Sequence, residues 1–527
     1  MIRNIVNSLL IGSVSLILWN CTAPQNKEYV KPNILFTILD DASYAHFGAY
    51  GCDWVKTPAF DRVASEGILF TRAYTPNAKC APSRSCILTG RNSWQLEEAV
   101  NHWPYFPNKF KTYAETLTEN GYHVGYSGKG WAPGIPGEID GVKRNLAGKP
   151  YQAKTLTPPT KHISPTDYTS NFINFLDANE KGEPFCFWYG SKEPHRTYEY
   201  GSGKSKGGKS TSDIDKVYSF WPDTDSVRTD MLDYAYEIEY ADNHLGLMLD
   251  ELEKRGQLDN TIVVVTSDNG MPFPRIKGQE YEFSNHLPLA IRWPQGIKNP
   301  GRKVDDFVNF IDFAPTFLEV AGIDNVKAGM QPIQGGSLVN IFESGKSGIV
   351  DQTRDHVLIG KERHDIGRPN DWGYPIRGIV KGDYLFIQNF EPDRWPAGNP
   401  ETGYLNCDGG ATKTVCLDQQ GDSENNKYWK WSFGKRPDME FYNIKNDPEC
   451  MNNLVGQSDT KGLMVELKDQ LYQELKEQSD PRLTGNVEAL EKIVYADKSG
   501  TNFYTRYMNG EKMNTGWVND TDFRPLE

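Results

Sequence analysis

Cysteine is scarce in this sequence, with 8 residues in 527, and no two of them form the Cys-x-x-Cys pair of a thiolate zinc site. So few cysteines in so long a chain exclude a small fold held together by disulfides. Cys407 and Cys416 are near enough in sequence to close one short loop in an oxidising compartment, but spacing alone leaves this pairing open.

Positive charge is also scarce, because 70 acidic residues outnumber 57 lysines and arginines and give a formal net charge of -13. Affinity for phosphate backbones comes mainly from lysine and arginine. The composition therefore argues against nucleic acid as a partner. An anionic substrate would need a local basic patch.

Long apolar runs are absent beyond the N-terminus, which argues against a transmembrane protein. The apolar stretch from Ile5 to Trp19 is too short for an ordinary spanning helix, so we interpret residues 1–21 as a signal peptide. Residues 18–21, Leu-Trp-Asn-Cys, resemble a loose bacterial lipoprotein cleavage box, which predicts lipidation of Cys21. The protein would then be a periplasmic or cell-surface lipoprotein that meets the membrane only through its lipid anchor. A plain signal peptide cut nearby is the alternative.

Apolar residues make up 38% of the chain, which is enough for a sizeable core. Four short apolar runs are typical of buried strands: residues 33–39, 124–127, 184–189 and 262–266. Helical patterns lie between them, and the clearest covers residues 231–255, where apolar residues recur at steps of three and four. Strands that alternate with helices predict an α/β fold with a large, mostly parallel central sheet covered on both faces.

The pattern of predicted elements changes past residue 350, where short strand pairs such as 376–380 and 384–388 precede an amphipathic stretch over 462–477. We therefore predict a catalytic domain over residues 30–350. A smaller C-terminal α+β subdomain, with a small antiparallel sheet and a helix, would cover 351–527. The glycine- and lysine-rich segment 201–209 predicts a mobile surface loop and a candidate lid.

Polar residues follow each of the four predicted strands. They are Asp40, Asp41, Lys129, His195, Asp268 and Asn269. Ligand sites of open α/β sheets lie beyond the carboxyl ends of the strands, so we expect these side chains to converge. The acidic and amide groups offer only oxygen ligands, which suits a hard cation such as Ca²⁺ better than zinc. Two solvated turns, at Asp40-Asp41 and at Asp268-Asn269, are the alternative.

Cys80 precedes Pro82, a favourable first helical residue, and Gly90 is a favourable terminator, so we predict a short helix over residues 82–89. Cys80 would lie at the positive end of this helix, which stabilises anions. Arg84 can fold back towards it along the same face. A buried structural cysteine is the alternative.

The run from Cys80 to Arg91, CAPSRSCILTGR, resembles the sulfatase signature C-x-P-S-R followed by x-x-x-L-T-G-R. In that family a maturase oxidises the cysteine to formylglycine, whose hydrated aldehyde attacks sulfur. The resemblance implies an alkaline-phosphatase-like α/β sandwich with a small C-terminal subdomain. It spans residues 32–454 of this chain.

The resemblance also implies roles for individual residues. The implied Ca²⁺ ligands are Asp40, Asp41, Asp268, Asn269 and the formylglycine at position 80. Arg84 would hold the formylglycine, and Lys129, His195 and Lys277 would surround the sulfate, with His195 protonating the leaving group. One position departs from the family: Trp131 stands where a histidine that helps to regenerate the aldehyde is expected. That duty would pass to His102 or to a carboxylate.

Residues 267–274 with Lys277, and also 193–196 and 374–377, resemble the heparan sulfamidase branch of the family. Candidate substrate-binding residues are Arg196, Glu199, Tyr200, Lys361, Glu362, Arg363 and His364. The favoured function is hydrolysis of N- or O-sulfate from a sulfated saccharide, such as a glycosaminoglycan or a mucin-type glycan. A phosphatase or phosphodiesterase of the same superfamily and an inactive glycan-binding lipoprotein are the alternatives.

Overall fold

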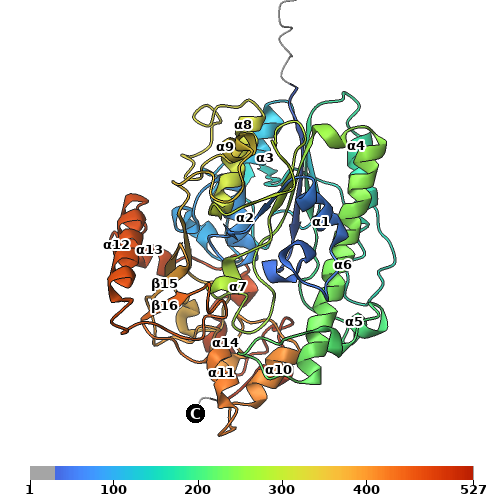
Figure 1. Ribbon diagram of the computed structural model, residues 1–527. Coiled ribbons are helices and arrows are strands. Elements are labelled where there is room, and N and C mark those ends of the chain that lie inside the picture. Colours follow the sequence, from blue (N-terminus) through green and yellow to red (C-terminus); the bar gives the residue numbers. More distant parts are fainter. Residues whose placement is uncertain (1–29, 526–527) are drawn as a thin grey trace, which may run out of the picture. The chain divides into compact units, whose positions relative to one another are not determined.

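A central eight-stranded sheet carries the site, as the computed structural model of residues 30–525 shows (Figure 1). The predicted signal peptide and the Cys21 lipidation site lie outside the described residues. In sheet order the strands are β11 (Arg302–Val304), β2 (Ile68–Phe70), β10 (Ala290–Arg292), β9 (Thr261–Ser267), β1 (Asn33–Leu39), β8 (Phe185–Gly190), β4 (His123–Gly128) and β7 (Lys149–Pro150). Strand β10 is antiparallel to both of its neighbours, and all other pairings are parallel. The predicted mostly parallel sheet is confirmed.

Helices cover both faces of this sheet. Successive side chains of a strand point to opposite sides, and both sides of β1 carry apolar residues that are buried under helices. Helices α1, α4 and α6 lie on one side of the sheet, and α2, α3, α8 and α9 lie on the other (Figure 1). Leu35 and Leu39 of β1 pack with the first group, whereas Ile34 and Phe36 pack with the second. The bounds of these helices are α1 Pro58–Ser65, α2 Cys80–Thr89, α3 Tyr113–Glu119, α4 Tyr168–Asp177, α6 Asp225–Lys254, α8 Phe313–Val320 and α9 Val339–Ser344. The two apolar faces explain why the central strands are continuous hydrophobic runs.

The long helix α6 begins at Asp225, six residues before the predicted start, because Thr224 caps it by accepting a hydrogen bond from the Val227 amide. The prediction of a mobile loop over residues 201–209 is wrong. Helix α5 (Ser202–Ser205) lies in this segment and packs on α6. Asp233 accepts hydrogen bonds from the amides of Gly201 and Gly203, both at 2.8 Å. A side chain at Gly203 would collide with the α6 backbone, so glycine here permits close packing.

A four-stranded antiparallel sheet follows, with order β13 (His356–Lys361), β14 (Ile376–Lys381), β15 (Tyr384–Asn389) and β16 (Met439–Asn443). Helix α12 (Lys461–Glu477) covers one face through Leu467, Leu471 and Leu475. The other face packs on Tyr74, Tyr281 and Phe307. The strand pairs and the helix agree with the sequence prediction, and the boundary at residue 350 stays a prediction.

The rest of the C-terminal third wraps back onto the main sheet layers. Helix α10 (Ala411–Asp418) packs against α6, and α11 (Asn426–Phe433) packs against α10. The final segment holds α13 (Val487–Glu491) and α14 (Phe503–Met508). Smaller elements are β3 (Ala73–Tyr74) paired with β12 (Val308–Asn309), β5 (Glu138–Ile139) paired with β6 (Val142–Lys143), and α7 (Glu282–Asn285). Within residues 30–525, no helix combines the length and apolar character needed to cross a membrane.

Candidate active site

The residues that follow the four central strands, β9, β1, β8 and β4, lie at one edge of the sheet. Leu39 of β1 lies beside Ser267 of β9, and Ile38 lies beside Gly190 of β8. Gly190 in turn lies beside Gly128 of β4. The residues that follow these strands therefore leave the sheet side by side, as expected.

Cys80 is the first residue of α2, two residues before the predicted start at residue 82. All ten residues of the helix are buried, and Gly90, with a φ of 68°, caps its C-terminal end. Burial raises the pKa of the Cys80 thiol to about 12. An unmodified thiol in this position would stay protonated at neutral pH.

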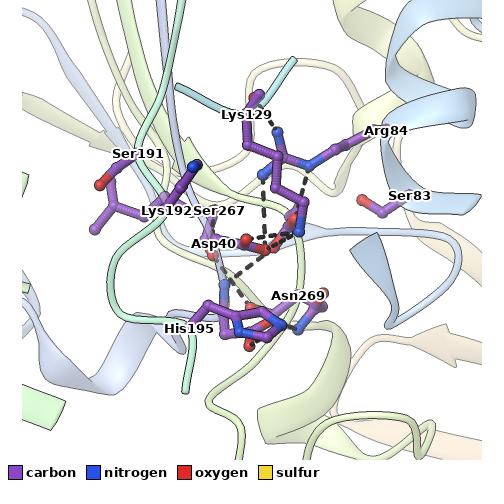
Figure 2. A network of polar contacts seen from close by, with 12 residues as sticks. Asp40, Ser83, Arg84, Lys129, Ser191, Lys192, His195, Ser267 and Asn269 are labelled. Atoms are coloured by element: carbon purple, nitrogen blue, oxygen red, sulfur yellow. Dashed lines mark hydrogen bonds and ion pairs between the residues drawn. The ribbon is translucent and has the colours of Figure 1, made fainter. Parts of the chain in front are cut away.

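A cluster of three acidic or sulfur groups surrounds this helix end. One carboxylate oxygen each of Asp40 and Asp268 and the sulfur of Cys80 lie within 4.8 Å of one another. Arg84 donates from Nε to Asp268 at 2.8 Å and from Nη1 to the carbonyls of Lys129 and Gly130. Lys129 Nζ donates to both oxygens of Asp40, at 2.8 and 2.6 Å, so Lys129 and Arg84 converge on the cluster (Figure 2).

The donor atoms of this cluster fit a hard divalent cation. Asn269 donates from Nδ2 to Asp41 at 2.8 Å and to the Gly270 carbonyl, which leaves its buried Oδ1 without a hydrogen-bond partner. Burial and the neighbouring Asp40 charge raise the pKa of Asp268 to about 7. Carboxylate and amide oxygens crowded together in a buried site are the donor set that Ca²⁺ prefers.

A second group of charges flanks the cluster. Lys277 Nζ donates to Asp41 at 2.6 Å and to Asp408 at 2.8 Å, and it is almost fully buried. His195 donates from Nδ1 to the Arg196 carbonyl at 2.6 Å, because a carbonyl oxygen only accepts. This bond fixes the tautomer and leaves Nε2 on the side of the site, 3.8 Å from Asp41.

A pocket of about 280 Å³ opens beside Cys80. Its lining residues are Lys79, Cys80, His102, Trp103, Lys129, Ala132, Pro133, His195, Lys277, Asp365, Asp408, Tyr495 and Trp517. The structure thus brings Cys80, Lys129, His195 and Lys277 to one cavity. The sequence analysis did not predict eight of the lining residues: Lys79, Trp103, Ala132, Pro133, Asp365, Asp408, Tyr495 and Trp517. Lys79 could have been found from its place directly before Cys80, but Asp408, Tyr495 and Trp517 come from segments without a motif.

Trp131 does not line this pocket. Its indole Nε1 donates to the Ser85 hydroxyl at 2.8 Å, and its ring packs edge-on against Phe106. His102, by contrast, lines the pocket and bonds through Nδ1 to Asp365 at 2.9 Å. Burial lowers the pKa of His102 to about 4, so the ring is neutral at neutral pH although Asp365 opposes the shift.

The predicted substrate residues Arg196, Glu199 and Tyr200 do not line the pocket beside Cys80, but a second, larger groove shares Lys129, Ala132 and His195 with it. Arg196 lines this groove, but both of its Nη atoms are bonded to Asp230, at 2.8 and 2.7 Å. Glu199 accepts a hydrogen bond from the Lys161 amide. Tyr200 is exposed and lines a third cavity, to which Arg196 also contributes.

The other four predicted substrate residues, at 361–364, are buried and bonded within the protein. Lys361 donates to the Gly278 carbonyl, and Glu362 binds two guanidinium groups. Arg363 donates to the Ile493 carbonyl, and His364 bonds to Asn77 at 2.7 Å. The structure places none of these four side chains on the pocket beside Cys80, because β13 and the turn after it bury them.

Cys407 and Cys416 are both buried and free, so no disulfide joins them in this structure. Cys416 lies inside α10, and Cys407 precedes Asp408 in the loop that reaches the pocket. The seven cysteines in the described part of the chain are all free.

Comparison with known proteins identifies the family. The sulfatase family profile matches residues 32–323, more than half of the chain. An N-acetylglucosamine-6-O-sulfatase of Bacteroides thetaiotaomicron is 29% identical over 429 residues, 64% of this chain and 75% of that protein. The human N-sulphoglucosamine sulphohydrolase is 24% identical over 481 residues, 85% of this chain and 91% of that protein.

A solved structure in complex with its substrate, D-glucosamine-2-N,6-O-disulfate, matches with a TM-score of 0.60 at 23% identity. The match covers 86% of this chain and 99% of that one. This likeness confirms the predicted alkaline-phosphatase-like α/β sandwich. The signature at Cys80, the converging strand ends and the family profile agree, and the chain belongs to the sulfatase family of hydrolases.

Proposed function

We propose that this chain removes sulfate from a sulfated hexosamine or hexose at the pocket beside Cys80, with a formylglycine made from Cys80 and a bound calcium ion. The observation that carries the proposal is the convergence of Cys80, the carboxylates and the cations Lys129 and Lys277 on one cavity. Relatives named for N-acetylglucosamine 6-O-sulfate and N-sulphoglucosamine support a sulfated amino sugar.

Asp40, Asp41, Asp268 and Asn269 would hold the calcium ion. Calcium and formylglycine together would supply an aldehyde hydrate as nucleophile and a positive charge that polarises the sulfate group. Arg84 fixes the orientation of Asp268 through its Nε bond, so the carboxylate needs little rearrangement to act as a ligand.

Lys129 and Lys277 bind and orient the sulfate. Each ammonium is held by a carboxylate, Asp40 for Lys129 and Asp408 with Asp41 for Lys277, so the positive charges are fixed before the substrate arrives. Preorganised charges in a buried site stabilise developing negative charge more strongly than mobile ones in water. The two lysines also provide the local basic patch that an anionic substrate needs on a chain with a net negative charge.

His195 delivers a proton to the departing sugar oxygen or nitrogen. The Arg196 carbonyl holds Nδ1, so the proton is exchanged at Nε2 on the pocket side. General acid catalysis of this kind typically raises the reaction rate about 100- to 10,000-fold. His102, oriented by Asp365, accepts the proton in place of the family histidine. Trp131, which stands at the position of that histidine, points towards Ser85.

Mass spectrometry of the chain co-expressed with a formylglycine-generating maturase tests the nucleophile. The Cys80 peptide should lose about 18 Da, the difference between cysteine and formylglycine. Cys86 is the matched control, because it lies buried in the same helix and should keep its thiol. Cys80→Ala should lose activity and Cys86→Ala should keep it.

A panel of sulfated sugars tests the reaction and separates the alternatives. We expect sulfate release from at least one N-, 2-O-, 3-O-, 4-O- or 6-O-sulfated monosaccharide. The absence of both a mass loss at Cys80 and sulfate release from any of these sugars would refute the proposal. Activity on phosphate esters alone would favour a phosphatase or phosphodiesterase, and sugar binding without turnover would favour a glycan-binding protein.

We further propose that the protein is a periplasmic or cell-surface lipoprotein anchored through Cys21, which supports access to extracellular glycans. The support is the sequence before Cys21 alone. Metabolic labelling with an alkyne fatty acid should mark the wild-type chain and not Cys21→Ala. A wild-type chain without label in the membrane fraction would refute the anchor.

A further inference from the structure

We infer that Trp103, Tyr495 and Trp517 form an aromatic wall that receives the apolar face of a single sugar ring, so that the C-terminal segment determines which sugar is bound. The inference rests on the proposed function for the sulfate end of the pocket and adds the recognition of the ring. All three side chains line the pocket beside Cys80. Two of them come from the last 33 residues of the chain.

Trp103 is held in a conformation that bulky residues rarely adopt. Its φ is 53°, in the left-handed region, where a large side chain is strained. Such strain persists only where the surroundings impose it, and it concentrates at binding and catalytic sites. Here the Ala496 amide donates to the Trp103 carbonyl at 2.9 Å, which ties this backbone to the residue after Tyr495. The Trp103 and Tyr495 rings lie 6.1 Å apart, tilted by 45°.

The other two rings are also fixed by contacts behind the pocket. The Arg363 guanidinium lies 5.6 Å from the Tyr495 ring centre and donates to the Ile493 carbonyl at 2.8 Å. Trp517 donates from its indole to the Leu405 carbonyl at 2.9 Å, and its own carbonyl accepts from the Gly409 amide at 2.8 Å. The polar edge of Trp517 is therefore satisfied within the protein, and Arg363 positions the wall without contacting the pocket itself.

Two carboxylates line the same pocket and complement the wall. Asp365 is paired with Lys79 at 2.7 Å and with His102 at 2.9 Å, and Asp408 is paired with Lys277 at 2.8 Å. Ionised carboxylates accept hydrogen bonds from hydroxyl groups, and aromatic rings cover C–H surfaces. A pyranose ring has both kinds of surface, polar at its edge and apolar on its face.

The size of the pocket indicates one ring rather than several. Its volume of about 280 Å³ lies just below the range of about 300–1,000 Å³ that is usual for small-molecule sites. The sulfate end is fixed by Lys129 and Lys277, so the space left beside the wall suits the ring that bears the sulfate. A few well-placed polar groups among aromatic side chains are typical of such a site.

Kinetics with variants of the wall test the inference. In the mature enzyme, Trp103→Ala and Trp517→Ala should each lower kcat/KM for the best sulfated monosaccharide by about tenfold or more, chiefly through KM. The inhibition constant of inorganic sulfate should stay within about twofold, because sulfate occupies only the charged end. Trp517→Phe should retain more activity than Trp517→Ala, since it keeps an aromatic face. Trp372→Ala is the control, because Trp372 is 38% exposed and lies against Arg394 outside the pocket.

Calorimetric titration of the unmodified chain, made without a maturase, separates this inference from the proposed function. The desulfated monosaccharide should bind to the wild-type chain and more weakly to Trp517→Ala, whether or not the enzyme turns over. Binding of the sugar to the unmodified chain, together with no sulfate release by the mature enzyme, would refute the proposed function and leave the wall. The wall is refuted if the monosaccharide does not bind, or if the wall variants leave its affinity unchanged. It is also refuted if those variants weaken sulfate and sugar equally.

Discussion

Replacing Glu362 by glutamine should destabilise the protein without weakening substrate binding. Glu362 is 3% exposed and accepts hydrogen bonds from Arg377 at 2.8 Å and from Arg482 at 2.7 Å. Asp480 still neutralises Arg377, whereas Arg482 keeps only Glu491, at 2.9 Å, so the substitution leaves Arg482 with less compensating charge. Breaking a buried ion pair by removing one partner typically costs about 3–5 kcal/mol. Unfolding entropy of about 2.1 cal/mol/K per residue sums to about 1 kcal/mol/K for a chain of this length, so the unfolding midpoint should fall by about 3–5 °C.

Differential scanning calorimetry, together with KM for a sulfated sugar, decides the question. Glu488→Gln is the matched control, because Glu488 is an exposed residue of α13 that pairs with Lys492 just after the helix. This control substitution should leave the unfolding midpoint unchanged. A stable Glu362→Gln variant with a raised KM would refute this reasoning. It would restore the role in substrate binding that the sequence suggested.

The pH dependence of the same variant provides a second check. Burial alone would raise the pKa of Glu362, but the Arg482 and Arg377 guanidinium groups hold the pKa below its usual range. A carboxyl with a depressed pKa stabilises the folded state above its unfolded pKa of about 4.3 and loses this contribution as the pH falls through the folded value. The difference in midpoint between wild type and Glu362→Gln should therefore be full at pH 7 and shrink below about pH 4.

Three further outcomes are expected. Lys129→Met should lower kcat/KM about 100- to 1,000-fold because a fixed positive charge beside the sulfate is lost, whereas the exposed Lys181→Met should have no effect. His195→Asn should lower kcat about 100- to 10,000-fold for a sugar sulfate and far less for an aryl sulfate, whose phenolate leaves without a proton. Chelation of divalent cations should lower the unfolding midpoint, and added Ca²⁺ should restore it, because Asp40 and Asp268 repel each other when the site is empty. A midpoint insensitive to chelator would contradict the metal site.

The sequence predicted the parts of the site that local patterns determine. Asp40, Lys129 and Asp268 each follow a buried apolar run, so their meeting at one edge follows from parallel pairing alone. Helix α2 is likewise marked by Pro82 and Gly90, and the start at Cys80 differs by only one half-turn.

Other parts of the site depend on contacts between residues far apart in sequence. Glu362 and Arg363 follow strand β13, as Asp40 follows β1, but two arginines, Arg377 and Arg482, bind Glu362 within the protein. Asp408 and Trp517 reach the pocket only because the C-terminal third wraps back over the main sheet. Such contacts leave no periodic pattern, and propensity cannot reveal them.

The hydrogen bond between the Ala496 amide and the Trp103 carbonyl joins residues almost 400 positions apart. During synthesis, Cys80, Lys129, His195 and Lys277 have all been made once the chain has passed Lys277, but Asp408, which holds Lys277, comes later, and the wall must wait for the last segment to emerge and dock. The side chains inferred to contact the sugar ring and those proposed to contact the sulfate therefore lie largely in different parts of the sequence. If the wall recognises the ring, changes after α12 alter the sugar that is accepted and leave Cys80, Lys129, His195 and Lys277 unchanged.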